Sequence, residues 1–312
     1  MKVCFIGMCG HSMQVYQTLK KYKDIELCGV APGSEHEQMR DTFSKEVPFF
    51  PDYSNMLDVT HPDLAVISPV FALTGSIITK CAMRGIDVLA EKPIASSLKE
   101  LKVVKEAVDH SGIRFCAMHF LRYLPSFYFA GNLAKEGAVG QIKMITAQKS
   151  YKFGTRPDWF EDRSLYGGTI PWVGIHAIDW ISYFTGKQFL SVKSLQSGNP
   201  EKVALCQFEL EDHIMASVNL DYYRPQSAPT HGDDRIRCVG TQGVLEVIGA
   251  TVTLINKDGL KDWRPVDSPN LTEEFISGRD CISPDEIFRI TAAALAAQES
   301  ADSGKVVRIS EV

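Results

Sequence analysis

The stretch VLAEKPIASS, residues 88–97, places two opposite charges, Glu91 and Lys92, directly after an apolar run, with Pro93 fixing the backbone behind them. A short apolar run of this kind is typical of a strand that is buried on both faces of a sheet. In an open parallel sheet, ligands bind outside the carboxyl ends of the strands. The stretch therefore predicts a strand end at which a half-buried lysine faces a ligand. A surface ion pair between neighbouring residues would explain the same pattern.

Short apolar runs alternate with amphipathic stretches on both sides of this segment. Strands are predicted over residues 2–7, 25–31, 63–68, 87–90 and 113–119, and helices over 12–22, 73–85 and 97–112. Ser97 and Glu100 have the spacing of a capping box at the start of the third helix. Strands that alternate with helices at this spacing predict a parallel sheet covered on both faces.

After about residue 120 the pattern changes to long strands with alternating polarity. Strands are predicted over 142–151, 202–210, 214–223, 235–240, 244–249 and 251–255, and helices over 125–137, 169–186 and 283–304. Ser283, Pro284 and Glu286 give the last helix a capping box. We predict an α/β Rossmann-type domain over 1–120, followed by an α+β domain over 121–312 with an open, mostly antiparallel sheet. The last helix and strand are expected to be able to pack back on the first domain.

The composition favours a small-molecule ligand. The chain has 312 residues, of which 45% are hydrophobic and 23% charged, and its net charge is −5. No lysine- or arginine-rich block marks a nucleic-acid binder. The eight cysteines contain no CxxC pair, which argues against a zinc site and a disulfide framework. Because a signal peptide and an apolar run of ~20 residues are both missing, we expect a cytoplasmic protein with no metal and no membrane partner.

The stretch FIGMCGHS, residues 5–12, lies between the first strand and the first helix, where a dinucleotide fold holds a pyrophosphate on backbone N–H groups. Cysteine and serine replace the second and third glycines of the usual G-x-G-x-x-G pattern, so a plain strand-to-helix turn is an equal alternative. The second strand ends without the acidic residue that binds a ribose 2′-hydroxyl, and the choice between NAD and NADP stays open. The candidate cofactor-binding residues are Gly7, Met8, Cys9, Gly10, His11, Ser12, Ser34, Ser68, Pro69, Glu91 and Lys92, while His36 and Arg40 are further candidates for a 2′-phosphate.

Several motifs occur together along the chain: a strand, AEKP and a capped helix, then GG and GIHAID about eighty residues later, and RIRCVGTQGVLEV and ESADSGKVVRIS near the end. In this combination the sequence resembles the Gfo/Idh/MocA oxidoreductases over nearly its whole length. The resemblance implies a nicotinamide-binding Rossmann domain and a second domain whose open sheet carries substrate residues and often an oligomer interface. It also implies oxidation or reduction of sugars, inositols or related polyols, and a homodimer or homotetramer.

The resemblance assigns roles to three residues. Lys92 matches the family's Glu-Lys-Pro lysine, which contacts cofactor and substrate, His176 matches the histidine used for proton transfer, and Asp179 matches the acid one turn later. These three are the candidate catalytic residues. The sequence departs from the family at Trp172, because many family dehydrogenases carry an aspartate four residues before the histidine. The acid partner of the histidine is therefore lost or supplied elsewhere.

The residues themselves agree with this assignment. Helical spacing places Trp172, His176, Asp179 and Tyr183 on one face of a helix that follows a Gly-Gly turn, although a stripe of this kind also suits a packed core. Aromatic and basic residues before that helix suit stacking on a sugar ring, or a packed loop. The candidate substrate-binding residues are His119, Arg122, Tyr123, Tyr151, Arg156, Trp159, Trp172 and His176. For Arg122, a salt bridge between the domains is an equally good account.

The leading hypothesis is an NAD(P)-dependent oxidoreductase that transfers a hydride between nicotinamide and a sugar-like or cyclic polyol. Two alternatives follow from the same resemblance. One is an NAD-dependent glycosidase that oxidises its substrate transiently, and the other is a regulator that binds sugar or nucleotide without catalysis.

Overall fold

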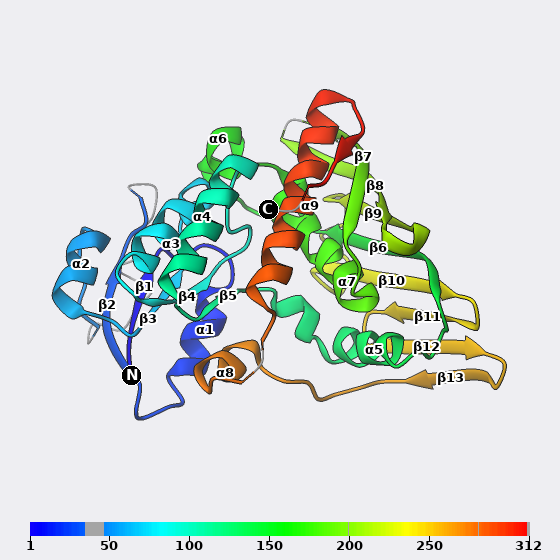
Figure 1. Ribbon diagram of the computed structural model, residues 1–312, viewed down its shortest axis with the longest axis horizontal. Helices are drawn as coiled ribbons and strands as arrows, with labels where there is room; N and C mark the ends of the chain where they lie inside the picture. The colour runs from blue at the N-terminus through cyan, green and yellow to red at the C-terminus, as the bar shows by residue number, and fades with distance from the viewer. Residues whose placement is uncertain (35–46, 199, 280, 311–312) are drawn as a thin grey trace.

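The computed structural model describes residues 1–34, 47–198, 200–279 and 281–310, so the candidates His36 and Arg40 lie outside the described residues. The chain forms two sheets that lie side by side, with the long helix α9 (Pro284–Ser303) between them (Figure 1). A parallel sheet at one side and an open, mostly antiparallel sheet at the other agree with the fold class that the sequence predicted.

The first sheet is entirely parallel, with strand order β2-β1-β3-β4-β5. Its elements are β1 (Lys2–Ile6), α1 (Ser12–Leu19), β2 (Glu26–Ala31), α2 (Tyr53–Thr60), β3 (Leu64–Ile67), α3 (Thr74–Ala82), β4 (Asp87–Ala90), α4 (Leu98–Ser111) and β5 (Phe115–Ala117). The parallel sheet is confirmed, but α2 was not predicted. The Ser97 side chain accepts from the Glu100 N–H as expected, whereas the Glu100 carboxylate bonds to Ser96 and does not close the box on Ser97.

The second sheet has the order β13-β12-β11-β10-β6-β9-β8-β7-β14, and all its pairs are antiparallel except β6 with β9. Its strands are β6 (Ile142–Tyr151), β7 (Phe189–Gly198), β8 (Glu201–Leu210), β9 (Ile214–Asp221), β10 (Gly232–Gly240), β11 (Gly243–Ile248), β12 (Thr251–Asn256), β13 (Gly259–Trp263) and β14 (Val307–Arg308). The helices α5 (Pro125–Lys135) and α7 (Ile175–Thr185) pack on one face (Figure 1). The mostly antiparallel sheet is confirmed, although β7, β13 and β14 were not predicted.

The remaining helical segments are short. They are η1 (Phe71–Leu73), η2 (Phe120–Tyr123), η3 (Asp158–Glu161), α6 (Arg163–Tyr166), η4 (Ile170–Gly174), η5 (Glu211–His213) and α8 (Leu271–Ile276). Of these, η4 is a π-helical turn that runs directly into α7, where one regular helix was predicted over 169–186. Such turns inside helices are frequent at functional sites.

Helix α9 belongs to both hydrophobic cores. Phe288 and Leu295 pack into the core of the first sheet, whereas Ile290 and Ala297 pack into the core of the second. The helix begins at Ser283, whose side chain accepts from the Glu286 N–H. The expected capping box is nevertheless incomplete, because the Glu286 carboxylate accepts hydrogen bonds from Arg122 and Ser182 instead of the backbone of Ser283. A single helix thereby couples the two halves of the chain.

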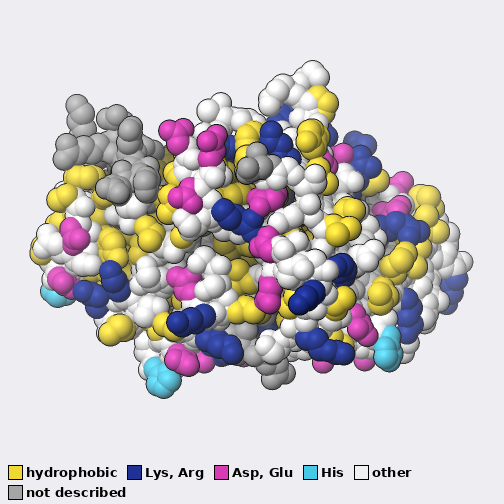
Figure 2. All heavy atoms as spheres, turned by 90° about the horizontal axis from the view of Figure 1, so that it is seen from above, with side chains coloured by type: hydrophobic (Ala, Val, Ile, Leu, Met, Phe, Trp, Pro, Cys, Tyr) yellow, Lys and Arg dark blue, Asp and Glu magenta, His cyan; other side chains and the backbone are white. Residues whose placement is uncertain are grey.

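Three exclusions made from composition can be compared with the structure. None of the eight cysteines, all of which are described, forms a disulfide; Cys9 and Cys281 are partly exposed and the other six are buried. Within the described ranges, no helix has the length and apolar character needed to cross a membrane. Acidic and basic side chains are interspersed over the face shown in Figure 2, which agrees with the lack of a basic block in the sequence.

Candidate active site

Glu91 and Lys92 stand at the carboxyl end of β4, where the sequence placed them, and they are 0% and 2% exposed. The Glu91 carboxylate accepts a hydrogen bond of 2.6 Å from the backbone N–H of His11 and lies 3.0 Å from the Nδ1 atom of its ring. Burial opposes ionisation of Glu91, but the neighbouring His11 and Lys92 lower the pKa of this carboxyl below its ordinary value. Glu91 therefore fixes the end of β4 to the start of α1.

The Lys92 ammonium has a neutral acceptor and an aromatic ring as close neighbours. Its Nζ atom donates 2.7 Å to the backbone oxygen of Trp172, lies 3.3 Å from the centre of the indole ring, and is 3.7 Å from Glu91. Burial lowers the pKa of Lys92 to about 7, and the charges of Lys149 and Arg156 contribute to this in spite of Glu91. A lysine with such a pKa can exchange a proton near neutral pH.

Trp172 is part of an aromatic cluster that covers Lys92. Its indole stacks on Phe71 with ring centres 3.6 Å apart, and Trp159 meets the same phenyl ring edge-on at 4.8 Å. The cluster is completed by Phe160 and Tyr166. The π-helical turn η4, which follows the Gly-Gly turn, carries Trp172 to this place. Trp159 and Trp172, both candidates for substrate contact, therefore lie together beside Lys92, and Phe71 is a member of this wall that the sequence analysis missed.

His176 lies on α7 beside two other histidines. Its ring centre is 5.6 Å from that of His11 and 6.4 Å from that of His119, and both contacts are edge-on. The Nδ1 atom of His176 and both ring nitrogens of His119 are buried without a hydrogen-bond partner among the described residues. Burial, with the nearby charge of Lys92, holds the pKa of His176 well below its usual range. The ring is therefore neutral at neutral pH, with a buried nitrogen that can accept a hydrogen bond.

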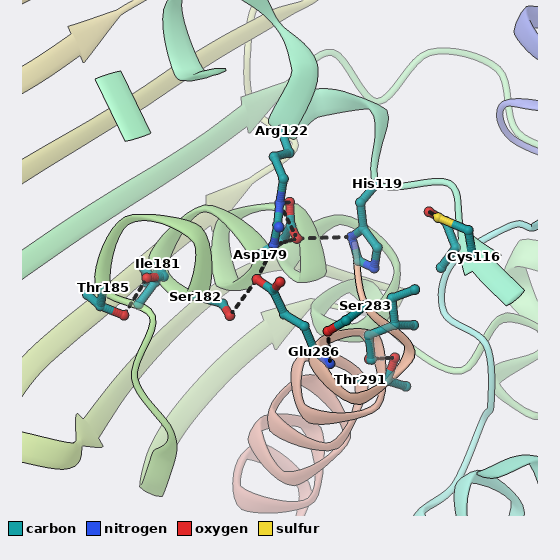
Figure 3. A network of polar contacts seen from close by, with 12 residues as sticks. Cys116, His119, Arg122, Asp179, Ile181, Ser182, Thr185, Ser283, Glu286 and Thr291 are labelled. Atoms are coloured by element: carbon teal, nitrogen blue, oxygen red, sulfur yellow. Dashed lines mark hydrogen bonds and ion pairs between the residues drawn. The ribbon is translucent and has the colours of Figure 1, made fainter. Parts of the chain in front are cut away.

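Asp179 faces Arg122, an arginine of the short helix η2 at the start of the second domain (Figure 3). The Arg122 guanidinium lies 2.6 Å from Asp179 and 2.6 Å from Glu286, and Ser182 donates 3.2 Å to Glu286. His119 is 3.6 Å from Asp179. Burial raises the pKa of Asp179 to about 6, against the effect of Arg122. Arg122, Asp179 and Glu286 all lie within 121–312, so these ion pairs join three segments of the predicted second domain rather than the two domains.

Tyr123 and Tyr151 lie at separate places around this centre. The Tyr123 ring stacks on Tyr128 with centres 5.9 Å apart, and its carbonyl accepts from Ser268. Tyr151, at the end of β6, accepts a hydrogen bond from Lys149 and meets His231 edge-on at 5.1 Å. Tyr151 is therefore bonded to Lys149, whose charge acts on Lys92, whereas Tyr123 packs on another aromatic ring.

Lys149 is a buried lysine that the sequence analysis did not select. It is 0% exposed, its ammonium lies 2.9 Å from Asp234 and 4.6 Å from the centre of the Trp180 ring, and burial lowers its pKa to about 8. The signal was present in the alternation of β6, because Ile145, Ala147 and Lys149 occupy successive inward positions. A lysine at an inward position of a strand indicates a buried polar site.

The glycine loop between β1 and α1 is closed tightly on its neighbours. Gly7 and Gly10 have φ of +75° and +66°, and a Cβ atom on Gly7 would lie 2.4 Å from Pro69. The Cys9 N–H donates 2.7 Å to the Ser68 carbonyl, and the Ser68 hydroxyl bonds back to Cys9. The loop therefore brings the ends of β1, β3 and β4 together.

The amino end of α1 suits a dinucleotide. The side chain of the N-cap residue His11 forms no capping hydrogen bond with the helix. The Ser12 hydroxyl is buried without a partner among the described residues. Unpaired N–H groups at a helix start, beside glycines with positive φ, form a favourable site for a pyrophosphate. Met8 lies within the same loop, and Ser34 follows the end of the neighbouring strand β2. These residues fit the phosphates and ribose of a nicotinamide cofactor.

Comparison with known proteins gives matches to both domains. Residues 1–119 match the model described as oxidoreductase family, NAD-binding Rossmann fold, and residues 129–246 match the GFO/IDH/MocA C-terminal domain. A solved structure of a putative oxidoreductase from Thermotoga maritima is 39% identical, with a TM-score of 0.94 over 99% of this chain and 100% of that one.

Two curated relatives are more distant. The mouse glucose-fructose oxidoreductase domain-containing protein 1 is 23% identical over 78% of this chain and 66% of its own length. The inositol 2-dehydrogenase of Salmonella typhimurium is 22% identical over 60% of this chain and 55% of its own length. The chain thus spans about half to two thirds of the curated relatives it matches here.

Proposed function

Because this chain belongs to the Gfo/Idh/MocA oxidoreductase family, whose first domain is an NAD-binding Rossmann fold, we propose that it oxidises or reduces a sugar-like or cyclic polyol. The observation that carries the proposal is the pair Lys92 and His176. Both are buried, both have a lowered pKa, and both lie beside His11 or Glu91 at the end of the glycine loop. The match to an inositol 2-dehydrogenase supports the substrate class.

In the oxidative direction, the substrate loses a hydroxyl proton and the carbinol hydrogen, and its C–O single bond becomes a carbonyl. Nicotinamide, when bound, supplies the acceptor for the hydride. Neutral Lys92, with His176 next to it, takes the hydroxyl proton, which is the kind of step that speeds a reaction by about 10²–10⁴-fold. Asp179 acts less directly, because Arg122, which also pairs with Glu286, holds its carboxylate in place.

The first test is a titration of the purified protein with NADH and with NADPH, followed by the fluorescence of the nicotinamide. We expect micromolar binding of at least one of them, and NAD(P)H formation in a subsequent screen of sugars and polyols. Turnover of a glycoside without net NAD(P)H formation would instead indicate the glycosidase alternative. Failure of both cofactors to bind to folded, nucleotide-free protein would overturn the proposal in favour of a regulator.

We also propose that the outer face of the second sheet is a contact between copies of this chain. Leu195 and Leu205 pair across β7 and β8 and are 61% and 48% exposed, and Met144 and Met215 pair across β6 and β9 and are 45% and 54% exposed. These two apolar pairs are separated on the same face by Gln207 and Ser217, and exposed apolar side chains on one sheet face favour self-association. Sedimentation should find a dimer or tetramer, and Leu205→Glu should shift it toward monomer. A monomeric parent protein at micromolar concentration would contradict the contact.

A further inference from the structure

Arg156, between β6 and η3, has a guanidinium group without an acidic partner. Among the residues that the structure describes, no carboxylate forms an ion pair with it, and its Nε atom is buried without a hydrogen-bond partner. A buried polar group that stays unpaired is unfavourable, because it has lost its water without gaining a partner. The unpaired donor is therefore a feature that a ligand would complete.

Aromatic rings hold this guanidinium in place. Its central carbon lies 5.2 Å from the ring centre of Phe160, 5.4 Å from that of Tyr222 and 5.8 Å from that of Phe153. Guanidinium groups stack on aromatic faces and leave the N–H groups at their edge free to donate in the plane. The rings therefore fix the position of Arg156 but leave its hydrogen-bonding capacity unused.

Phe160 connects Arg156 to the catalytic end of the site. It belongs to the aromatic cluster that contains Phe71 and Trp172, and the Trp172 ring lies 3.3 Å from the Lys92 ammonium. The charge of Arg156 also contributes to the lowered pKa of Lys92. Arg156 and Lys92 thus border the same part of the molecule.

Three buried cations of this region have acidic partners. Lys92 has Glu91 at 3.7 Å, Lys149 has Asp234 at 2.9 Å, and Arg122 contacts two carboxylates. Arg156 therefore gives the region a positive charge that no described side chain balances. A neutral polyol would leave this charge unbalanced, whereas an anionic one would balance it.

We propose that Arg156 binds an anionic group of the substrate, so that the substrate class is an acidic sugar or polyol that carries a carboxylate or a phosphate. This inference rests on the proposed function. The planar fork of an arginine donates two parallel hydrogen bonds to either group, which makes the pair specific as well as strong. Because Arg156 is partly buried beside aromatic rings, the interaction is stronger than at a fully open surface.

The test uses three probes that share one ring: D-glucose, D-glucuronate and D-glucose 6-phosphate. Each is titrated into the full chain at saturating NAD⁺, and tryptophan emission is the readout because Trp159 and Trp172 both lie in the aromatic cluster. We expect one anionic probe to bind at least about tenfold more tightly than glucose. Glucuronate as the tighter ligand would identify a carboxylate, and glucose 6-phosphate a phosphate.

Variants assign the preference to Arg156. Arg156→Gln should reduce the difference between anionic and neutral probes to about twofold or less, and Arg156→Lys should restore part of it. Arg235→Gln is the matched control, because Arg235 is an exposed arginine paired with Asp233 on β10 and should keep the full preference. A preference that survives Arg156→Gln, or equal binding of all three probes, would overturn the inference.

The same samples separate this inference from the proposed function. Nicotinamide fluorescence is measured on the parent protein before any probe is added. If the cofactor binds and no anionic preference is found, the anionic substrate class is wrong and the oxidoreductase proposal stands. If the cofactor does not bind while the anionic preference depends on Arg156, the oxidoreductase proposal fails and the anion site remains.

Discussion

The Lys92 ammonium donates to the backbone oxygen of Trp172 at 2.7 Å while the indole ring of the same residue lies 3.3 Å away. A carboxylate at the position of Trp172, which the resemblance to the family led us to expect, would favour the charged form of the lysine. A carbonyl and a ring favour it less, so the desolvation of Lys92 dominates and its pKa falls to about 7. The replacement thus adjusts the lysine toward the neutral form.

Lys92→Met should abolish most turnover and leave cofactor binding in place. Methionine retains the length of the side chain in a site that is 2% exposed, but it cannot take a proton. We expect kcat to fall by about 10²–10⁴-fold, with NADH affinity changed by no more than a few fold. Lys105→Met, at a half-exposed pair with Asp109 on α4, is the control and should keep activity. Wild-type turnover of Lys92→Met would disprove the assignment of the base.

The rate of oxidation should rise with pH through about 7, because the neutral form of Lys92 accepts the proton and its pKa lies there. Lys149→Met removes a nearby cation that lowers the pKa of Lys92, so the rise should move to higher pH. The check is kcat/KM from pH 5.5 to 9 for both proteins. A shift to lower pH, or identical profiles, would contradict the electrostatic link between the two lysines.

The same group makes stability depend on pH. The pKa of Lys92 is about 7 in the folded chain and 10.5 at its ordinary value, so between these limits the unfolded chain binds more protons. The contribution of Lys92 should therefore make the free energy of unfolding rise with pH between about 7 and 10.5. Urea titrations of the parent protein and of Lys92→Met isolate this part, and the variant should show a flatter dependence. Equal slopes for the two would exclude Lys92 as the source.

Arg122→Ala should destabilise the chain strongly, because it leaves the carboxylates of Asp179 and Glu286 without their shared partner. Removal of one partner from a buried pair typically costs about 3–5 kcal/mol in the free energy of unfolding. Arg84→Ala removes an exposed pair with Asp58 and should cost about 0–1 kcal/mol. Chemical denaturation of both variants gives the comparison, and equal losses would show that burial of this ion-pair network is not decisive.

Gly7→Ala should impair both folding and cofactor binding. Gly7 and Gly85 have nearly the same φ, +75° and +68°, but a Cβ atom would meet Pro69 at 2.4 Å in the first case and nothing within 4 Å in the second. Gly85→Ala therefore measures the backbone strain alone, about 1–2 kcal/mol. Gly7→Ala should cost more and weaken NADH binding at least tenfold, as measured by nicotinamide fluorescence. Similar effects of the two substitutions would argue against a close approach at the loop.

The local pattern was sufficient for most of the first domain. β1, β3, β4 and β5 are continuous apolar runs, and α4 begins at a serine cap that acts over three residues. Two of the unpredicted strands, β13 and β14, are exposed or very short, so their sequences carry little hydrophobic alternation. They are strands because a neighbouring strand supplies hydrogen bonds, which is a tertiary effect.

Sequence by itself determined the kind of protein: the position of Glu91 and Lys92 at a strand end, the glycine loop, and the helix that carries His176 all follow from short-range pattern and chemistry. Only the tertiary structure decided which charges are compensated. Arg122 contacts Asp179, 57 residues away, and Glu286, 164 residues away, whereas Arg156 stacks on aromatic rings and pairs with no carboxylate among the described residues. Short-range spacing along the chain does not reveal such distant partners. Because the pKa of a buried group depends on its partners, the sequence does not reveal that pKa either. An arginine therefore forms a structural ion-pair network in one place, at Arg122, and a candidate ligand site in the other, at Arg156.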